Sequence, residues 1–299
     1  MNYLSHLLIL FAVYAIMALS LNIILGFCGV FSLAHSAFFA IGAYVYALLS
    51  LRFRLDFILA AGAGVAVAAL LSLLISLPSW RLGGDYLLMV TLAAQSLIFS
   101  LLYNRYQLDA PVGSWRNLTN GPYGVMHVPG PVLAIWRFES TPAIAGVAVG
   151  TLIVVALVIR ALLSSPWGRL LEAVRDDELV ARNLGKHSRV AKVQALAIGC
   201  GIAGAAGALY ASYATYIDPS ICSTDDSILI LAMVLIGGLG SQWGPMIGAA
   251  VMVALPEGLR FLKLPQEMAA NLRTLILGVL LILTVHLRPQ GITGRLKVE

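Results

Sequence analysis

The chain has 299 residues, of which 60% are hydrophobic and only 11% are charged. A soluble globular domain carries about 25% charged residues, so this composition excludes the ordinary soluble classes and indicates a membrane protein. The net charge of +5 does not indicate nucleic-acid binding, because the basic residues do not interleave with aromatic ones. On a membrane protein, lysine and arginine mark cytoplasmic loops.

The residues that usually build metal or catalytic centres form no such pattern. Cys28, Cys200 and Cys222 make no disulfide framework, and two of them lie in apolar runs. No spacing among cysteine, histidine and carboxylate residues is typical of a metal site. There is also no arrangement of a nucleophile with a base. The sequence therefore predicts neither a metalloprotein nor an enzyme.

A membrane-spanning helix needs about 20 mostly apolar residues, and the chain contains eight candidate runs. In order they are 4–25, 27–51, 58–77, 86–102, 141–163, 193–216, 227–255 and 274–285. The first lacks the basic leader of a secretory signal, so we interpret it as a retained span. We expect an all-α, polytopic membrane protein of about eight transmembrane helices, forming a single domain over residues 1–299.

Two of these runs are rich in glycine and interrupted. The run 27–51 carries Gly29, Ser32, His35 and Ser36, and the run 227–255 contains GGLGSQWGP. Non-helical backbone at membrane depth is tolerated only where protein or water satisfies it. Corresponding interrupted spans in two halves of a transporter point to its translocation path. Both runs contain Ile-Gly-Ala, but the match is short, so an internal repeat and a coincidence stay equally open.

The distribution of basic residues predicts the sidedness of the loops. The long link 103–140 is rich in proline, glycine and asparagine, whereas the segment 165–192 holds six lysine and arginine residues. The positive-inside rule places 165–192 in the cytoplasm and 103–140 outside. We also expect the tail 288–299 in the cytoplasm. The run 227–255 must then cross as two short helices, or enter and leave by the same side.

The densest charge cluster lies in this cytoplasmic segment. Trp167, Leu170, Leu171 and Val174 follow helical spacing and form an apolar stripe. The next positions of this stripe would be the charged Asp177 and Glu178, so the segment does not form one straight amphipathic helix. We expect two short helices, the second with Asp176 as its N-cap and Gly185 as its stop. The alternative is a solvated loop that merely obeys the positive-inside rule.

Seven blocks, in family order and along most of the chain, resemble the branched-chain amino-acid ABC transporter permease family, in particular its LRGDY-bearing type. They are LNIILGFCGVFSLAHSAFFAIGAY (21–44), RLGGDYLLMVTLA (81–93), LTNGPYGV (118–125), GRLLEAVRDDELVARNLG (168–185), AGAAGALYASYATYIDP (203–219), IGGLGSQWGPMIGA (236–249) and RPQGI (288–292). The chain departs from the family pattern at Ala34, at an extra leucine within 81–86, and at Tyr123.

The resemblance implies an importer in the bacterial inner (plasma) membrane for branched-chain or related hydrophobic amino acids. Its partners would be a second homologous permease, two cytoplasmic ATPases, an extracytoplasmic solute-binding protein and membrane lipid, with no nucleic acid. The chain has no Gly-x-x-x-x-Gly-Lys-Ser/Thr pattern, so we expect it to hold no cofactor and to leave ATP to the ATPases. Urea, amides or aromatic acids as substrates, and an ATP-independent secondary transporter, remain as alternatives.

The resemblance also suggests site residues. In ABC importers a cytoplasmic helix sits in a groove on each ATPase, and 168–185 looks like that coupling element. Its candidate coupling residues are Glu172, Ala173, Asp176, Asp177, Glu178, Leu184 and Gly185.

The polar residues at membrane depth and the glycines of the interrupted runs are candidates for the translocation path. They are Asn22, Ser32, His35, Thr91, Gln95, Gly238, Gly240 and Ser241. For the polar ones at membrane depth, hydrogen bonding between helices is the competing interpretation.

Overall fold

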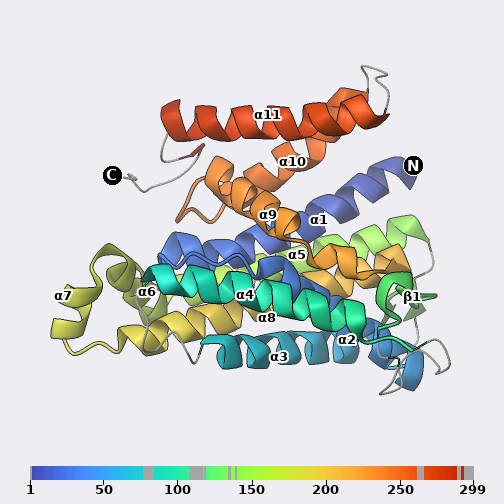
Figure 1. Ribbon diagram of the computed structural model, residues 1–299, viewed down its shortest axis with the longest axis horizontal. Helices are drawn as coiled ribbons and strands as arrows, with labels where there is room; N and C mark the ends of the chain where they lie inside the picture. Colours follow the sequence, from blue (N-terminus) through green and yellow to red (C-terminus); the bar gives the residue numbers. More distant parts are fainter. Residues whose placement is uncertain are drawn as a thin grey trace.

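The computed structural model describes residues 2–76, 84–107, 117, 119–133, 136–138, 140–260, 266–287 and 291–292 (Figure 1). Its helices are α1 (Asn2–Asn22), the π-helix η1 (Ile23–Phe27), α2 (His35–Phe53), α3 (Phe57–Ser76), α4 (Gly84–Asn104), η3 (Gly121–Tyr123), α5 (Thr141–Ser164), α6 (Pro166–Asp176), α7 (Glu178–Asn183), α8 (Ser188–Ala214), η4 (Pro219–Cys222), α9 (Thr224–Gly237), α10 (Gly244–Arg260) and α11 (Gln266–Leu287). The strands are β1 (Val125–Met126), β2 (Val132–Leu133), β3 (Trp136–Arg137) and β4 (Tyr216–Ile217).

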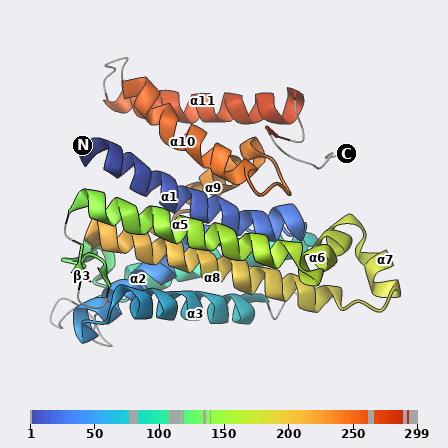
Figure 2. The same ribbon diagram turned by 180° about the vertical axis from the view of Figure 1, so that it is seen from behind.

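The long helices lie roughly along one axis, and the connections gather at two ends of the molecule. One end, which we call the α7 end, holds α6, α7 and the C-terminal end of α11 (Figures 1 and 2). The other, the β1 end, holds the short strands and the N-terminus. The N-terminus therefore lies at the end opposite the charged segment.

Two pairs of short strands lie at the β1 end, and one of them joins distant parts of the chain. β1 pairs antiparallel with β4, so that Val125 lies opposite Ile217, and β2 pairs antiparallel with β3. The first pairing ties the link after α4 to the connection that leaves α8. This contact holds together the loops at the β1 end.

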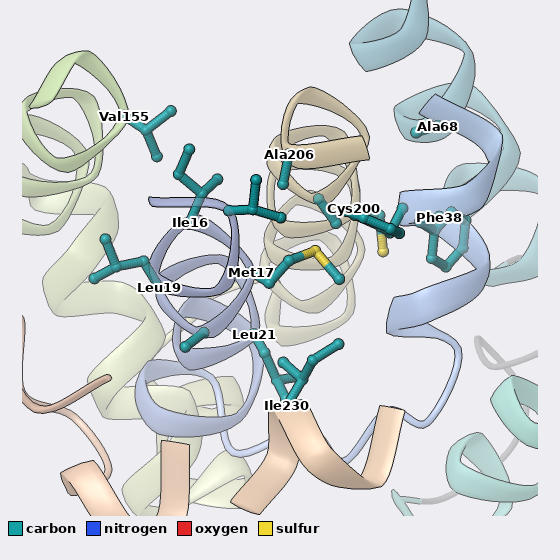
Figure 3. Close-up of a cluster of buried hydrophobic side chains, with 14 of the residues drawn as sticks. Ile16, Met17, Leu19, Leu21, Phe38, Ala68, Val155, Cys200, Ala206 and Ile230 are labelled. Carbon is teal, nitrogen blue, oxygen red and sulfur yellow. The ribbon is translucent and has the colours of Figure 1, made fainter. Parts of the chain in front are cut away.

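Three helices form the interior of the bundle. The most apolar window is 72% buried in the α1 span, 67% in α2 and 72% in α8, against 22–28% in α3, α4 and α5. Figure 3 shows α1 surrounded by its neighbours: Ile16 lies beside Val155 of α5, and Leu21 beside Ile230 of α9. The outer helices leave apolar side chains exposed, as expected of surfaces that meet lipid.

Close approach of backbones joins α2, α3 and α8. A Cβ added to Gly207 of α8 would lie 1.9 Å from the carbonyl oxygen of Phe39, and one added to Gly42 would lie 2.1 Å from that of Gly204. Only glycine permits these contacts. Small residues at helix interfaces are the usual means of packing in membranes, where apolar burial between helices supplies little net driving force.

The predicted all-α, polytopic class is confirmed, and the prediction of two interrupted spans agrees with the backbone. Within the described residues, six helices are long and apolar enough to cross a membrane: Tyr3–Phe27, His35–Phe53, Phe57–Ser76, Tyr86–Asn104, Thr141–Ser164 and Ser188–Ala214. The run 227–255 divides into the short helices α9 and α10. The expected total of eight spans is not established by these lengths.

Three boundaries differ from the predictions. The second span is helical only from His35, because residues 28–34 form an irregular segment in which Gly29 has φ +70°. α8 begins at Ser188 rather than at residue 193, so the last charged residues of 165–192 belong to its first turns. Asp176 ends α6 and does not cap the next helix. Much of 103–140 and most of 288–299 lie outside the described residues.

Candidate functional site

The N-terminus of α2, where the first irregular segment ends, takes hydrogen-bond partners from α4. Its N-cap residue, Ala34, offers no side-chain acceptor. Thr91 Oγ1 accepts from the backbone N–H of Leu33 at 3.2 Å, and Gln95 Oε1 accepts from that of Ala37 at 3.1 Å. Thr91 thus satisfies an amide just before the helix start, and Gln95 gives a second acceptor to the amide of Ala37, which also donates to the carbonyl of Ala34 at 3.1 Å. This geometry favours the helix-bonding interpretation of both residues, and their role in translocation stays a prediction.

A second group of bonds ties the same N-terminus to α9. Ser227 Oγ accepts from the N–H of Ser36 at 3.1 Å and donates to Ser36 Oγ at 2.9 Å, while Ser36 Oγ donates to the carbonyl of Ser223 at 2.6 Å. Gln95 Nε2 donates to Ser36 Oγ at 2.7 Å and to the carbonyl of Cys222 at 2.8 Å. The sequence analysis did not select Ser36 or Ser227 as site residues. Each is a serine near the start of a helix, and only the contact between the N-termini of α2 and α9 gives them a shared role.

His35, the first residue of α2, is fully buried and contacts α1. Its Nε2 lies 2.6 Å from Ser20 Oγ, and that hydroxyl donates to the carbonyl of Met17 at 2.7 Å. Nδ1 of His35, like Oγ of the buried Ser32, has no hydrogen-bond partner within the described part of the chain. The contact with Ser20 supports the structural interpretation of His35 over the path-lining one.

Asn22, at the end of α1, holds the break between α9 and α10. Its Nδ2 donates to the carbonyl of Ser241 at 2.8 Å, and its Oδ1 accepts from the N–H of Gly240 at 3.2 Å. Gly238 and Gly240 have φ of +113° and +70°, a conformation that favours glycine. A Cβ added to Gly26 would lie 2.6 Å from the nitrogen of Gly240. The end of the α1 span, formed by Asn22 and η1, therefore contacts the α9–α10 break directly.

The C-terminal segment returns to the same break. The N–H of Ile292 donates to the carbonyl of Ile236 at 3.1 Å. A Cβ added to Gly291, which has φ +73°, would lie 2.4 Å from the Cα of Gly238. The described part of the tail thus covers the α9–α10 break at the α7 end.

α6 is an amphipathic helix with one buried and one exposed face. It begins after Ser165, whose Oγ accepts from the N–H of Trp167 at 3.2 Å. Leu171 and Val174 are buried, whereas Glu172 and Ala173 are exposed. The predicted coupling residues of α6 therefore lie on its outward face.

α7 is a short helix capped at both ends. Asp177 is its N-cap, since its Oδ1 accepts from the N–H groups of Leu179 and Val180 at 2.8 and 3.0 Å. Gly185 stops the helix with φ +76°. The N–H of Gly185 donates to the Arg182 carbonyl at 2.9 Å, and the N–H of the next residue to the Ala181 carbonyl at 3.1 Å, a Schellman motif. The two-helix prediction and the stop agree with this geometry, and the cap is one residue later than predicted.

The outward side of α7 is apolar. Leu179, Val180 and Leu184 are 68%, 52% and 74% exposed, which is high for three neighbouring apolar side chains. Such an edge on a helix outside the membrane span is typical of a surface that another protein covers.

Glu178 fixes α7 to the start of α8. Its carboxylate accepts from Lys192 Nζ at 2.5 Å and from Ser188 Oγ at 2.9 Å. Burial alone would raise the pKa of Glu178, but the two hydrogen bonds and the nearby charges of Lys192 and Arg182 outweigh it, so the pKa lies below its ordinary value of 4.5. The carboxylate is thus the form that the folded segment favours.

Arg175 joins α6 to the end of the α1 span. Its Nη1 donates to the carbonyl of Gly26 in η1 at 2.8 Å, and its stem lies against Gly29, where a Cβ would come within 2.9 Å. Nη2 of Arg175 pairs with Asp176 at 2.8 Å. Because Gly26 also contacts the Asn22–Gly240 pair, one continuous set of contacts runs from α6 to both irregular segments.

The Glu178 contacts predict an acid-sensitive segment. A carboxylate whose pKa is lowered on folding stabilises the fold above its unfolded pKa, and that contribution is lost as the pH falls through the folded pKa. Glu178→Gln should reduce the protection of the α7 amides against hydrogen exchange by about twofold to fivefold at pH 7, as expected for a half-exposed pair. The same loss should occur in the unaltered protein as the pH falls through the lowered pKa of Glu178.

The matched control for this change is Asp176→Asn, which removes an exposed carboxylate that pairs with its neighbour Arg175. Mass spectrometry of residues 178–184, corrected for the intrinsic exchange rate at each pH, provides the measurement. Equal protection of α7 in Glu178→Gln and the unaltered protein at pH 7 would refute the role of this carboxylate.

Comparison with known proteins identifies the family. The sequence model of the family described as branched-chain amino acid transport system / permease component matches residues 3–285. The high-affinity branched-chain amino acid transport system permease proteins LivM of Escherichia coli (strain K12) and Salmonella typhimurium (strain LT2) are each 31% identical over 94% of this chain and 67% of their own length.

A third relative matches the chain over nearly its whole length. The probable branched-chain amino acid transport permease protein LivM of Methanocaldococcus jannaschii is 27% identical over 96% of this chain and 92% of its own length. No solved structure shows a significant match to the chain. The resemblance found in the sequence blocks is confirmed, and the chain belongs to the branched-chain amino acid transport permease family as a multi-pass membrane protein.

Proposed function

We propose that the chain is the permease subunit of an ATP-driven importer for branched-chain or related hydrophobic amino acids. The observation that carries the proposal is its likeness to LivM along 94% of the chain. We propose the bacterial inner membrane as its location, on the same ground. Urea, amides and aromatic acids remain alternative substrates, which a transport assay separates.

The proposed orientation places the α7 end in the cytoplasm and the β1 end outside. The concentration of lysine and arginine in 165–192 supports it through the positive-inside rule. In this orientation α1 begins on the outside. The short helix α9 runs toward the cytoplasmic side, and the short helix α10 returns from it. The described tail residues 291 and 292, which contact the α9–α10 break, then lie on the cytoplasmic side with α7, as expected for the tail.

The partners of the chain follow from the same proposal. A second, homologous permease completes the pore, and two separate ATPases bind at the cytoplasmic side, so that this chain itself binds no ATP. A solute-binding protein delivers substrate at the β1 end. The pairing of β1 with β4, which links two connections at that end, supports it as a stable docking platform.

The α6–α7 pair is the proposed coupling element. Glu172, Ala173, Asp176 and Asp177 are exposed, as are Leu184 and Gly185, and Glu178 holds the pair against α8. The exposed apolar edge of α7 fits a groove on an ATPase, as in helix-in-groove recognition. Movement of this pair then reaches the transmembrane region through Arg175 and Gly26.

The first prediction of this proposal concerns energy coupling. Vesicles holding the chain with its partner permease, ATPases and binding protein should take up leucine or a related amino acid only when ATP is supplied. Vesicles holding this chain alone should show no uptake driven by an ion gradient. Gradient-driven uptake by the chain alone, indifferent to ATP, would instead establish the secondary-transporter alternative.

The second prediction concerns Arg175. Arg175→Met keeps an apolar stem beside Gly29 but removes the hydrogen bond to Gly26, so it should lower transport per ATP hydrolysed at least fivefold while the ATPases stay bound. Removal of a charged hydrogen bond of this kind costs about 1.5–3 kcal/mol. The readouts are ATPase activity, leucine uptake and co-purification of the subunits.

Arg169→Met is the matched control, because Arg169 is exposed on the same helix. It should leave the ratio of transport to ATP hydrolysis unchanged. An unaltered ratio in Arg175→Met, with the complex intact, would show that coupling does not pass through the Gly26 contact.

A further inference from the structure

A small groove of about 70 Å³ lies on the side of the bundle, between α5 and the α9–α10 break. Its floor comes from α1, which packs against both α5 and α10 (Figure 2). Leu19 of α1 and Ile159 of α5 are buried in this floor, and Ala156 and Met246 add further apolar surface. Leu157, beside them, is 59% exposed on the outer face of a membrane span. The groove is therefore lined like a surface that a hydrocarbon chain covers.

The rim of the groove carries polar groups that can donate hydrogen bonds. Arg160 of α5 and Trp243 of the α9–α10 break are exposed, and Gln242 is half-buried. None of these three side chains has a hydrogen bond or an ion pair within the described part of the chain. No aspartate or glutamate is among the described residues that line the groove. Guanidinium, amide and indole groups are all donors, so the groove joins an apolar floor to a positive charge without a counter-ion.

Arg160 lies at the depth of the lipid headgroups. It stands in the last turns of α5, in a span of 24 residues that has no other charged residue. A helix of that length extends about 36 Å, which exceeds the apolar core of a bilayer, about 30 Å. The end of α5 therefore reaches the headgroup layer, where tryptophan side chains such as Trp243 are also favoured.

We propose that this groove binds one anionic phospholipid of the cytoplasmic leaflet, with Arg160 on the headgroup phosphate and an acyl chain against Leu19 and Met246. Arginine binds phosphate oxygens through two parallel hydrogen bonds. A free phosphate ion makes no use of the apolar floor, and a hydrocarbon leaves the arginine unpaired. A zwitterionic headgroup brings its own ammonium, which competes with Arg160 for the phosphate. The combination of groups therefore selects an anionic lipid.

The proposed lipid joins two parts of the molecule that move separately in the coupling scheme. Gln242 and Trp243 belong to the break that Asn22 holds from α1, whereas Arg160 belongs to α5, which leads into α6. A lipid in the groove contacts both. The inference goes beyond the proposed function, and only the choice of leaflet depends on the orientation proposed there.

Trp243 can report the occupant of the groove, because brominated acyl chains quench the fluorescence of a tryptophan that they contact. The assembled complex is placed in nanodiscs of phosphatidylcholine with a rising fraction of brominated phosphatidylglycerol or of brominated phosphatidylcholine. The signal of Trp243 is the difference between each complex and its Trp243→Phe counterpart. Half-quenching should need an about threefold lower fraction of the brominated phosphatidylglycerol, on the scale of a partly exposed ion pair.

Arg160→Gln keeps a polar side chain but removes the charge, so the two brominated lipids should quench Trp243 equally in that complex. Arg169→Gln is the matched control, because Arg169 is exposed on α6 and does not line the groove. It should keep the preference for phosphatidylglycerol. Ala156→Leu fills the floor and leaves Arg160 in place, so it should reduce quenching by both lipids. Co-purification of the subunits and the melting temperature check the fold of each variant.

Three results would overturn the lipid site. They are equal quenching by the two lipids in the unaltered complex, a preference that Arg160→Gln leaves unchanged, and no quenching of Trp243 by either lipid. The last of these would show that another protein chain covers the groove. If one of these results accompanies normal ATP-driven uptake of leucine, the lipid site fails and the proposed function stands. If quenching follows the prediction but no hydrophobic amino acid is transported, the lipid site stands and the proposed function fails.

Discussion

The need to satisfy backbone polar groups within a membrane is the constraint on which this structure depends. Two places in the chain meet this constraint: the N-terminus of α2, which follows the irregular residues 28–34, and the non-helical break between α9 and α10. Both are satisfied by side chains from other helices: Gln95 and Thr91 serve α2, and Asn22 serves the break. These hydrogen bonds, together with the close contact between Gly26 and Gly240, form a contact network around the two irregular segments.

This network explains how a charged segment at one end of the molecule is joined to the interior. Arg175 binds the carbonyl of Gly26, and Gly26 lies against Gly240, which Asn22 holds. A displacement of α6 therefore acts on a backbone that is already irregular and lacks the rigidity of a regular helix. The π-helix η1 stands at this junction, and such insertions are frequent at functional sites. The apolar edge of α7 is the proposed outer contact, with the ATPase.

The sequence predicted the features that depend on local chemistry. The division of the charged segment into two helices was recognised from a broken apolar stripe, and the stop at Gly185 from the preference of glycine for positive φ. The cap was misplaced by one residue, because Asp176 and Asp177 are equally good cap residues until the pairing of Asp176 with Arg175 distinguishes them. The family blocks then identified the kind of protein.

What could not be predicted depends on contacts between distant residues. Arg175 and Gly26 are 149 positions apart, and Asn22 and Ser241 are 219 apart. Gln95 was therefore known only as a polar residue at membrane depth, and its bonds to Ser36 and to the carbonyl of Cys222 depend on the meeting of three helices that no short motif encodes.

The central claim is that α6 controls the irregular segments through Arg175. The most direct measurement is the rate at which a thiol reagent modifies Gln242→Cys, in the α9–α10 break, within the assembled complex before and after ATP binding; all three native cysteines are buried. We predict that ATP changes this rate severalfold in the complex with Arg175, and that Arg175→Met removes the response while the ATPases remain bound. An ATP response of equal size in the Arg175→Met complex would contradict the account.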